Sequence, residues 1–545
     1  MIPSGNPDPS YTQLMPRLIV LVAAVAAFTS ACVAGADVVP IDPNAPATTF
    51  EPVTTLPELD SSTTADPITP ETTSGDSTTP TVTAAPNREP GVVPAASVGQ
   101  PWGSVVGLTM FRGNPTRTFF GTGPVPKTAP SVLWRFPQNP MCGQSPDGVE
   151  AKVWCGSGWT GQPVVWERDD GITEVIFGAY DKNIHFLDAA TGERTRPDFP
   201  MGDIIKGSVT IDPDGFPLLY TGSRDPRFRI LALDSDEPRE VWSLHATSVE
   251  GMWNDDWDSN PVVIDDMLYE GGENSWWFAV KLNRAFDADG MVTVDPKVVC
   301  EIPAWTAELQ ETFGRQHSVE GSTVVFDQEA FFATSAGRVV GVDVSDAEAS
   351  GCPIVFDFWN GDDTDATMSM DAQGHLYVVS HGDTAKTSNT AARRVREVGD
   401  LIKLDPNDPD DPIVWSTHLS AARGQDAGAW ATPALHPSAG LLYVATDTGD
   451  LLAVDTNNGE VVWDDFIGGN AWSSPVITEE TLVVGIDCLT ERAGFRAYDL
   501  ADPRSPTQLW DVEVGAGSCV ESTPAIWDGR MYVGSRDGFF YALGS

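Results

Sequence analysis

Short apolar strands and Gly- or Asp-rich turns alternate along the chain from about residue 100 to its end. The clearest copy spans 441–455, where the apolar run LLYVA is followed by the turn TDTG and the returning strand DLLAVD. Apolar runs joined by such turns are typical of antiparallel hairpins. A further strand in most units carries an aromatic residue after an aliphatic one, as in Val414-Trp415 and Val462-Trp463. The pattern therefore predicts units of four antiparallel strands.

These units repeat, and each begins with small residues and often a proline. The beginnings recur at intervals of about 42 to 65 residues, which is the length of a propeller blade with insertions. Their third residues are Pro163, Val209, Pro261, Thr323, Met368, Pro433, Pro475 and Pro524. We therefore predict an all-β fold, an eight-bladed β-propeller of four-stranded antiparallel blades.

The two ends of the repeat region predict how the ring closes. The last unit stops at Ser545 after three strands and lacks the strand that carries the aromatic residue. A strand of that type, VLWRF at 132–136, stands alone before the first complete unit. Because a ring must hide its strand edges, we expect this N-terminal strand to complete the last blade. The alternative is a seven-bladed ring against which 132–136 only packs.

One repeat carries a family signature. Ala453, Asp455, Gly459 and Trp463 form an A-x-D-x3-G-x3-W run that resembles the pyrroloquinoline-quinone (PQQ)-like repeat. The resemblance covers residues 105–545, and MFRGNPT at 110–116 also resembles the lead-in of these propellers. The family includes quinoprotein dehydrogenases, which use PQQ and Ca²⁺, and a non-enzymatic propeller lipoprotein of outer-membrane-protein assembly. The vicinal Cys-Cys of the dehydrogenases and a Cys-x-x-Cys-His haem site are both absent.

The N-terminus resembles an export signal. An apolar run at 18–28 follows Arg17 and leads through small residues to Cys32, as in a lipobox. Thr29 stands where that motif usually has Leu, so ordinary cleavage remains an alternative, and Met15 is an alternative start. We predict an exported, extracytoplasmic protein that is lipid-anchored to the cell membrane through Cys32.

Composition divides the rest of the chain and excludes some partners. After a signal over 1–32, residues 33–100 are rich in Thr, Pro, Ser and acids, and predict a disordered tether before the propeller at 101–545. The chain has 78 Asp and Glu against 32 Lys and Arg, a formal net charge of −46. Such a charge repels nucleic acid and anionic lipid, so we expect neither as a partner, and the anchor is the expected membrane contact. We expect a monomer.

Six further cysteines in an exported chain predict disulfide bonds. Their positions in the repeat suggest the pairs Cys142–Cys155, Cys300–Cys352 and Cys488–Cys519. The first pair lies in one insertion, whereas Cys300 and Cys352 begin the outer strands of neighbouring blades and their pairing stays open. Metal ligation is the competing interpretation, but the chain has no Cys-x-x-Cys pair.

Residues three positions before each strand beginning should lie at the mouth of the central channel, where propellers place ligands. They are Thr160, Lys206, Asp258, Glu320, Asp365, Trp430, Trp472 and Glu521. Asp258, Glu320 and Asp365 are candidate ligands for a hard cation such as Ca²⁺. Lys206 is a candidate partner for an anionic group, and the indoles for a planar ring. Trp257 adds to this set because it lies in the densest acidic and aromatic segment.

A purely structural role is the alternative for this ring. In this repeat family, Trp and small polar residues lock blades together whether or not a ligand binds, and acids are ordinary loop residues in so acidic a chain. The Asp- and Pro-rich run at 405–412 suits a solvated turn. His317 and His381 show no paired metal spacing, so both are assigned to loops or core.

Three functions follow, from different classes. The first is a surface-tethered envelope binding or scaffolding propeller without catalytic residues, which holds an envelope protein or a glycan at the channel mouth or on its loops. The second is a PQQ- and Ca²⁺-dependent oxidoreductase acting on alcohols or sugars. The third is a glycan-binding module that uses the same Trp-rich mouth.

Overall fold

The computed structural model describes residues 89–147, 150–159, 161–382, 388–419, 428–486, 493–515 and 518–545. The chain divides into two units, Met1–Asp76 and Ser77–Ser545, and everything described here belongs to the second. The predicted signal, Cys32, most of the predicted tether, Thr160 and Cys488 lie outside the described residues. Among the described residues, no helix is long and apolar enough to span a membrane.

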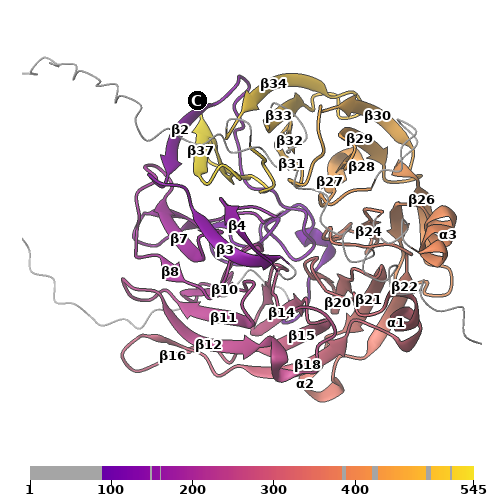
Figure 1. The fold of residues 1–545 in the computed structure, drawn as a ribbon, viewed down its shortest axis with the longest axis horizontal. Coiled ribbons are helices and arrows are strands. Elements are labelled where there is room, and N and C mark those ends of the chain that lie inside the picture. Colours follow the sequence, from indigo (N-terminus) through magenta and orange to yellow (C-terminus); the bar gives the residue numbers. More distant parts are fainter. Residues whose placement is uncertain are drawn as a thin grey trace, which may run out of the picture. The chain divides into compact units, whose positions relative to one another are not determined.

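Eight four-stranded antiparallel sheets are arranged around a centre (Figure 1). In blades 1 to 7 the strands follow each other outward in chain order. Blade 1 contains β5 (Val164–Glu167), β6 (Thr173–Gly178), β7 (Asn183–Asp188) and β8 (Phe199–Pro200), with β1 (Gly107–Leu108) paired to β5. Blade 2 contains β9 (Thr210–Ile211), β10 (Leu218–Thr221), β11 (Arg227–Ala232) and β12 (Arg239–His245). Blade 3 contains β13 (Val262–Ile264), β14 (Met267–Gly272), β15 (Trp276–Lys281) and β18 (Lys297–Pro303).

The same order continues through the second half of the ring. Blade 4 contains β19 (Val324–Phe326), β20 (Glu329–Ala333), β21 (Arg338–Asp343) and β22 (Ile354–Trp359). Blade 5 contains β23 (Ser369–Met370), β24 (Leu376–Val379), β25 (Leu401–Leu404) and β26 (Ile413–Thr417). Blade 6 contains β27 (Ala434–His436), β28 (Leu441–Ala445), β29 (Asp450–Asp455) and β30 (Val461–Phe466). Blade 7 contains β31 (Val476–Thr478), β32 (Thr481–Ile486), β33 (Gly494–Asp499) and β34 (Thr507–Glu513).

The eighth blade joins the two ends of the folded region. β35 (Ala525–Trp527), β36 (Arg530–Gly534) and β37 (Phe540–Gly544) are completed by β2 (Ser131–Phe136), which pairs antiparallel with β37. This pairing confirms the predicted closure and the count of eight, so the seven-bladed alternative is wrong. Its physical basis is the one expected, because β37 would otherwise expose an unpaired edge.

The outermost strand of most blades has the same irregularity just before its aromatic residue. In blades 2 to 8 the register between the third and outermost strands shifts at this point; in blade 6, Trp463 pairs with Ala453 but Val461 pairs with Val454. The skipped residue forms a bulge, which re-aims the following side chain. Trp415 then reaches the next blade, where its Nε1 donates to the carbonyl of Thr456 at 2.9 Å.

The glycine of the repeat signature makes room for that indole. Gly459 has a φ of +74°, and a Cβ at this position would lie 2.6 Å from the Trp415 ring. The A-x-D-x3-G-x3-W pattern therefore encodes both a turn and the docking of a tryptophan from the preceding blade.

Further elements are inserted between blades and within them. The hairpin of β3 (Cys142–Asp147) and β4 (Glu150–Cys155) and the helix α1 (Ala307–Phe313) lie between blades. The pair β16 (Ala285–Phe286) and β17 (Val292–Thr293) lies within blade 3, and the helices α2 (Ala347–Ser350) and α3 (Asn389–Val398) lie within blades 4 and 5. The structure contains the disulfides Cys142–Cys155, within the first hairpin, and Cys300–Cys352, between the outer strands of blades 3 and 4. Cys519 is also disulfide-bonded, and its predicted partner Cys488 is outside the described residues.

The folded unit includes residues that the sequence assigned to the tether. Val93 is fully buried and forms a β-bridge with Asp327 of blade 4, and a 3₁₀ turn follows at Ala95–Ser97. Ordered structure therefore begins before residue 101, because this polar-looking segment adds backbone hydrogen bonds and one apolar anchor to the ring.

Residues 109–122, between β1 and β2, form what we call the central segment. The backbone amides of Ile211, Val325 and Met370, which belong to the first strands of blades 2, 4 and 5, donate to its carbonyls. Its own Thr122 amide donates to Ile526 of blade 8. The central segment, which contains the predicted MFRGNPT lead-in, thus ties the innermost strands of several blades together.

Two arginines extend these ties to blades 3, 6 and 7 and add a further tie to blade 4. Arg112 and Arg117 are fully buried, and both side chains donate to backbone carbonyls of the ring at 2.8–3.2 Å. The acceptors are Thr432, Pro433 and Pro475 for Arg112, and Asn260 and Thr323 for Arg117. Burial lowers the pKa of both arginines to about 9, so both stay charged at neutral pH.

Candidate functional site

Seven residues of the predicted ring are described, and all lie in the segments that enter the innermost strands of the blades. We call them the mouth cluster: Lys206, Asp258, Glu320, Asp365, Trp430, Trp472 and Glu521. Further side chains reach them from the turns between the second and third strands. Contacts link several members to each other, directly or through these turn residues.

Lys206 forms the centre of an ion-pair network in blades 2 and 3. Its Nζ lies 2.5 Å from Asp258 Oδ2 and 3.8 Å from Glu273 Oε1. Glu273 comes from the turn after β14. Burial lowers the pKa of Lys206, but Asp258 and Glu273 outweigh burial and raise it above its ordinary value. Lys206 is therefore a permanent internal cation.

The acids of this network divide into charged and protonated groups. Burial raises the pKa of Asp258, but Lys206 outweighs it, so the pKa falls below its ordinary value. Burial and the nearby Asp258 charge raise the pKa of Glu273 well above the ordinary range. Asp256, which pairs with Arg224 at 2.6 Å, has its pKa raised by burial and by Asp258 to about 6.

Glu320 and Asp365 meet through a serine. Ser335 Oγ lies 3.4 Å from Glu320 Oε1 and 3.5 Å from Asp365 Oδ1, and Ser318 donates to Glu320 at 2.9 Å. Burial and the charge of Asp365 raise the pKa of Glu320 to about 8. Glu320 therefore holds a proton at neutral pH.

His381 lies between two carboxylates of blade 5. Its Nε2 is 3.5 Å from Asp363 Oδ2 and 3.3 Å from Asp365 Oδ2. Burial lowers the pKa of His381, but Asp363 and Asp365 outweigh burial and raise it well above the ordinary value. The ring of Trp430 lies against the imidazole, with 4.3 Å between ring centroids.

Three indoles complete the circuit. Trp430 stacks on Trp472 with centroids 5.1 Å apart, and Trp159 meets both edge-on at 5.6 and 5.4 Å. Lys206 Nζ lies 4.6 Å from the centroid of Trp159. Cation–π contacts of this length are favourable, so the indole faces are already used within the protein.

Two further predicted residues are engaged differently. Glu521 accepts from Arg536 Nη1 at 3.0–3.1 Å with both carboxylate oxygens. Trp257 does not belong to the mouth cluster, because its fully buried ring packs between Phe228 and Phe278. The structure thus places Trp257 in the core between blades 2 and 3.

The predicted Ca²⁺ ligands do not gather at one point. Asp258 groups with Asp256 and Glu273, whereas Asp365 groups with Asp363 and His381. Glu320 bonds to serines between these two groups. Among the described residues, three-ligand groups thus exist, but their membership differs from the predicted trio.

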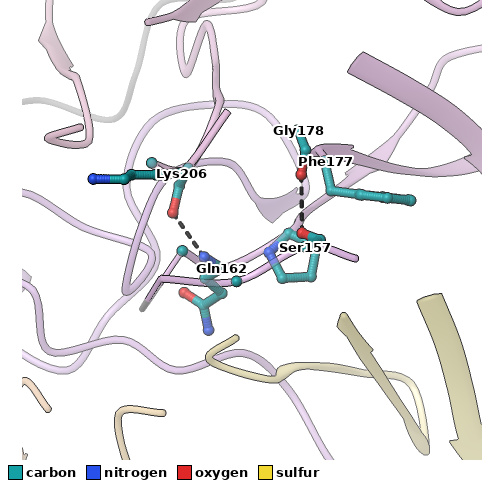
Figure 2. A pocket seen from close by; sticks show the side chains of 10 residues that line it. Ser157, Gln162, Phe177, Gly178 and Lys206 are labelled. Carbon is teal, nitrogen blue, oxygen red and sulfur yellow. Dashed lines mark hydrogen bonds between the residues drawn. The ribbon is translucent and has the colours of Figure 1, made fainter. Parts of the chain in front are cut away.

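The space beside Lys206 is small. A cavity of about 10 Å³ lies between Lys206, Gln162, Ser157 and Phe177 (Figure 2), which is room for about one water molecule. The Ser157 hydroxyl donates to the Gly178 carbonyl across its edge at 2.9 Å, as Figure 2 shows. PQQ is a planar polycarboxylate and would need a slot between aromatic faces and unpaired cations. The described mouth does not fit it, since the indoles contact one another and both Lys206 and Arg536 are held by carboxylates.

Sequence reasoning missed the partners that come from the turns between second and third strands. Each of these residues stands one or two positions after the end of a second strand: Glu273 after β14, His381 after β24 and Arg536 after β36. This position was the available signal, because these turns lie at the same end of each blade as the segments entering the first strand.

Comparisons with known proteins agree with the repeat type. A family model described as outer membrane protein assembly factor BamB matches residues 397–544, which include the last two strands of blade 5, blades 6 and 7, and β35 to β37 of blade 8. The signature and this match support the prediction of PQQ-like repeats in this propeller. No curated protein matches the sequence significantly.

Two solved structures are among those that this chain resembles. The crystal structure of BamB from Moraxella catarrhalis has 12% sequence identity and a TM-score of 0.47, covering 77% of this chain and 98% of that one. The computationally designed Ika8 protein has 10% identity and a TM-score of 0.46, covering 78% of this chain and 100% of that one.

Proposed function

We propose that this protein is an exported, non-catalytic propeller that binds a protein partner of the cell envelope at the end of the ring that carries the mouth cluster. The observation that supports this most is that the described mouth leaves little room for a ligand. Lys206 is paired with Asp258, Trp430 stacks on Trp472, and the cavity beside Lys206 is about 10 Å³. A partner therefore binds exposed residues beside the mouth cluster, which we call the rim, and does not enter the channel.

The rim offers one exposed aromatic side chain next to the mouth. The segment before β13 is divided: Asp256, Trp257 and Asp258 are buried, whereas residues 253–255 are exposed. Trp253 is 44% exposed, and the adjacent Asn254 donates to Glu273 Oε2 at 2.8 Å. Trp is the residue type most enriched among strong interface contacts. We assign Trp253 as the anchor of the interface.

Three observations support a location in the cell envelope. The matched family model carries the description of an outer membrane protein assembly factor. The disulfides Cys142–Cys155 and Cys300–Cys352 suit an oxidising, extracytoplasmic compartment. The predicted signal ending at Cys32 and the segment after it would hold the propeller at a membrane through a lipid.

Capture from an envelope extract with two matched variants tests this proposal. Trp253→Ala removes the rim anchor, and Phe466→Ala removes an equally exposed aromatic from the outer strand of blade 6, each residue being 44% exposed. We expect Trp253→Ala to lower recovery of the captured protein at least tenfold, or about 1.4 kcal/mol of binding free energy. Phe466→Ala should leave recovery unchanged.

Thermal unfolding of both variants serves as the folding control. Equal recovery by both variants would place the interface away from the mouth. Retention of purified oligosaccharide that depends on Trp253 would instead support the glycan-binding alternative.

A further inference from the structure

Three side chains of blade 5 present metal-ligand atoms to one point. Asp363 and Asp365 lie between β22 and β23, and His381 follows β24. One ligand atom from each lies within 4.8 Å of the others. His381 Nε2 is 3.3 and 3.5 Å from the two carboxylate oxygens, which is longer than the usual 2.7–3.2 Å of an N–H···O hydrogen bond.

These distances also match the separation of two ligand atoms on a common ion. Zinc bonds nitrogen and carboxylate oxygen at about 2.0–2.2 Å in tetrahedral geometry. The edge of a tetrahedron is about 1.6 times its bond length, which places two ligand atoms roughly 3.3–3.5 Å apart. The spacing around His381 Nε2 falls within that range.

An unused oxygen points independently to a ligand. Asp363 is 4% exposed, and its Oδ1 is buried without a hydrogen-bond partner among the described residues. Leaving a buried polar atom unsatisfied is costly, and such atoms are rare in folded proteins. A cation bound at this carboxylate would offset the cost of burying its charge.

The three ligands are held in place before an ion arrives. The Asp363 amide donates to Asp362 Oδ1 at 2.8 Å, and the His381 amide donates to the Asp363 carbonyl at 3.2 Å. The ring of Trp430 fixes the plane of the imidazole. Asp365 keeps 12% of its side chain exposed, which leaves access for an ion and for a water molecule as the fourth ligand.

The second acidic group of the mouth provides a contrast within the same protein. Asp256, Asp258 and Glu273 also bring ligand atoms within 4.8 Å. There, however, Lys206 and Arg224 lie on Asp258 and Asp256 at 2.5 and 2.6 Å, so protein cations occupy the position of an ion. The blade 5 group has an imidazole donor instead, which suits zinc, whereas Ca²⁺ requires six to eight oxygens.

We propose that Asp363, Asp365 and His381 bind one Zn²⁺ ion, with water completing the tetrahedron. The site is independent of the proposed partner and of the exposed rim. Its chemistry is that of a borderline divalent ion, because one nitrogen and two carboxylates form the ligand set.

Metal titration of the full chain, produced without a histidine tag and stripped with a chelator, tests the site. The probes are Zn²⁺ in competition with a chromophoric indicator, and Co²⁺, whose visible absorption reports tetrahedral coordination. We expect one ion per chain for the unaltered protein. His381→Gln and Asp363→Asn should weaken Zn²⁺ binding at least a hundredfold, whereas Glu273→Gln in the other acidic group should leave it unchanged.

Each outcome of the titration supports or overturns the proposed zinc site. Failure of the unaltered chain to bind Zn²⁺ at micromolar concentration overturns the proposal, and that measurement needs no variant. Equal weakening by Glu273→Gln would move the ion to blades 2 and 3 and also overturn it. Where His381→Gln does not fold by circular dichroism, the Co²⁺ spectrum of the unaltered chain stands as the deciding measurement.

Discussion

The central segment and the mouth cluster lie along the same innermost strands, but their buried charged groups have different kinds of partner. In the central segment, Arg112 and Arg117 are fully buried and surrounded by backbone carbonyls from the ring. In the mouth cluster, charged side chains face other charged side chains, and atoms such as Asp258 Oδ1 and Asp363 Oδ1 have no hydrogen-bond partner among the described residues.

This difference suits a fixed structural role for the two arginines and the binding roles that we propose for the mouth. Carbonyls cannot change their charge, so the two arginines form a fixed network whose acceptors come from four blades. Carboxyls can gain or lose protons, and Glu320, with its pKa near 8, stays protonated at neutral pH because burial and the charge of Asp365 outweigh the charge of Lys206. Unsatisfied, proton-holding groups of this kind cluster at functional sites.

Removing the central segment is the strongest way to break the comparison. A chain that starts at residue 140 loses β1, the central segment and β2 but retains the whole mouth cluster. We expect it not to fold as a monomeric propeller, because blade 8 then exposes the edge of β37 and the ring loses its central hydrogen bonds. Circular dichroism and size-exclusion chromatography provide the measurement.

A chain that starts at residue 89 is the matched control and should retain its full stability. If the chain from residue 140 were monomeric and equally stable, the ring would not depend on the central segment or on β2.

Single substitutions sharpen the comparison at smaller scale. Arg112→Ala leaves buried carbonyls of blades 6 and 7 without donors, and we expect a loss of about 3 kcal/mol or more in the free energy of unfolding. Lys206→Met leaves Asp258 and Glu273, which can share a proton, so we expect a smaller loss. Denaturant unfolding of both variants at neutral pH measures the difference. Equal losses would contradict the distinction between the fixed hydrogen bonds of the central arginines and the carboxyls of the mouth, which can change protonation.

The sequence predicted those parts of the fold that repeat locally. Strand alternation, the Gly459 turn and the Trp463 position each occur within one blade, and the orphan strand at 132–136 completes the one unit that lacks its fourth strand. The disulfides Cys142–Cys155 and Cys300–Cys352 followed from the same repeat map. Local turn chemistry and period-2 patterns are what sequence records most directly.

The parts that were not predicted depend on long-range packing. Nothing in MFRGNPT shows that Arg112 will meet carbonyls of blades 6 and 7, more than three hundred residues away. Trp253 and Trp257 lie in one irregular segment without periodicity, and one is exposed while the other is buried. His381 shows no metal spacing in sequence because its companions, Asp363 and Asp365, come from a different connection.

The smallest expected effect concerns the pH dependence of stability through Glu320. Burial and Asp365 raise its pKa to about 8 in the folded protein, from an ordinary value of 4.5. Between these values the folded chain keeps a proton that the unfolded chain has released. The free energy of unfolding therefore decreases as pH rises through this window, by up to about 1.4 kcal/mol per pH unit for a single group.

Glu320→Gln removes this titration, so its stability should decline less steeply than that of the unaltered chain between pH 5 and pH 8 (roughly the window that the shift defines). Denaturant unfolding across that range measures the slope. Glu308→Gln, which changes an exposed carboxyl on α1, is the control and should leave the slope unchanged. The pKa of each central arginine is about 9, so these arginines do not titrate in this window. If only Glu320→Gln changes the slope of the free energy of unfolding against pH, the pH response therefore belongs to the mouth. Identical slopes for all three proteins would mean that the carboxyls of the mouth are screened by water and ionise normally.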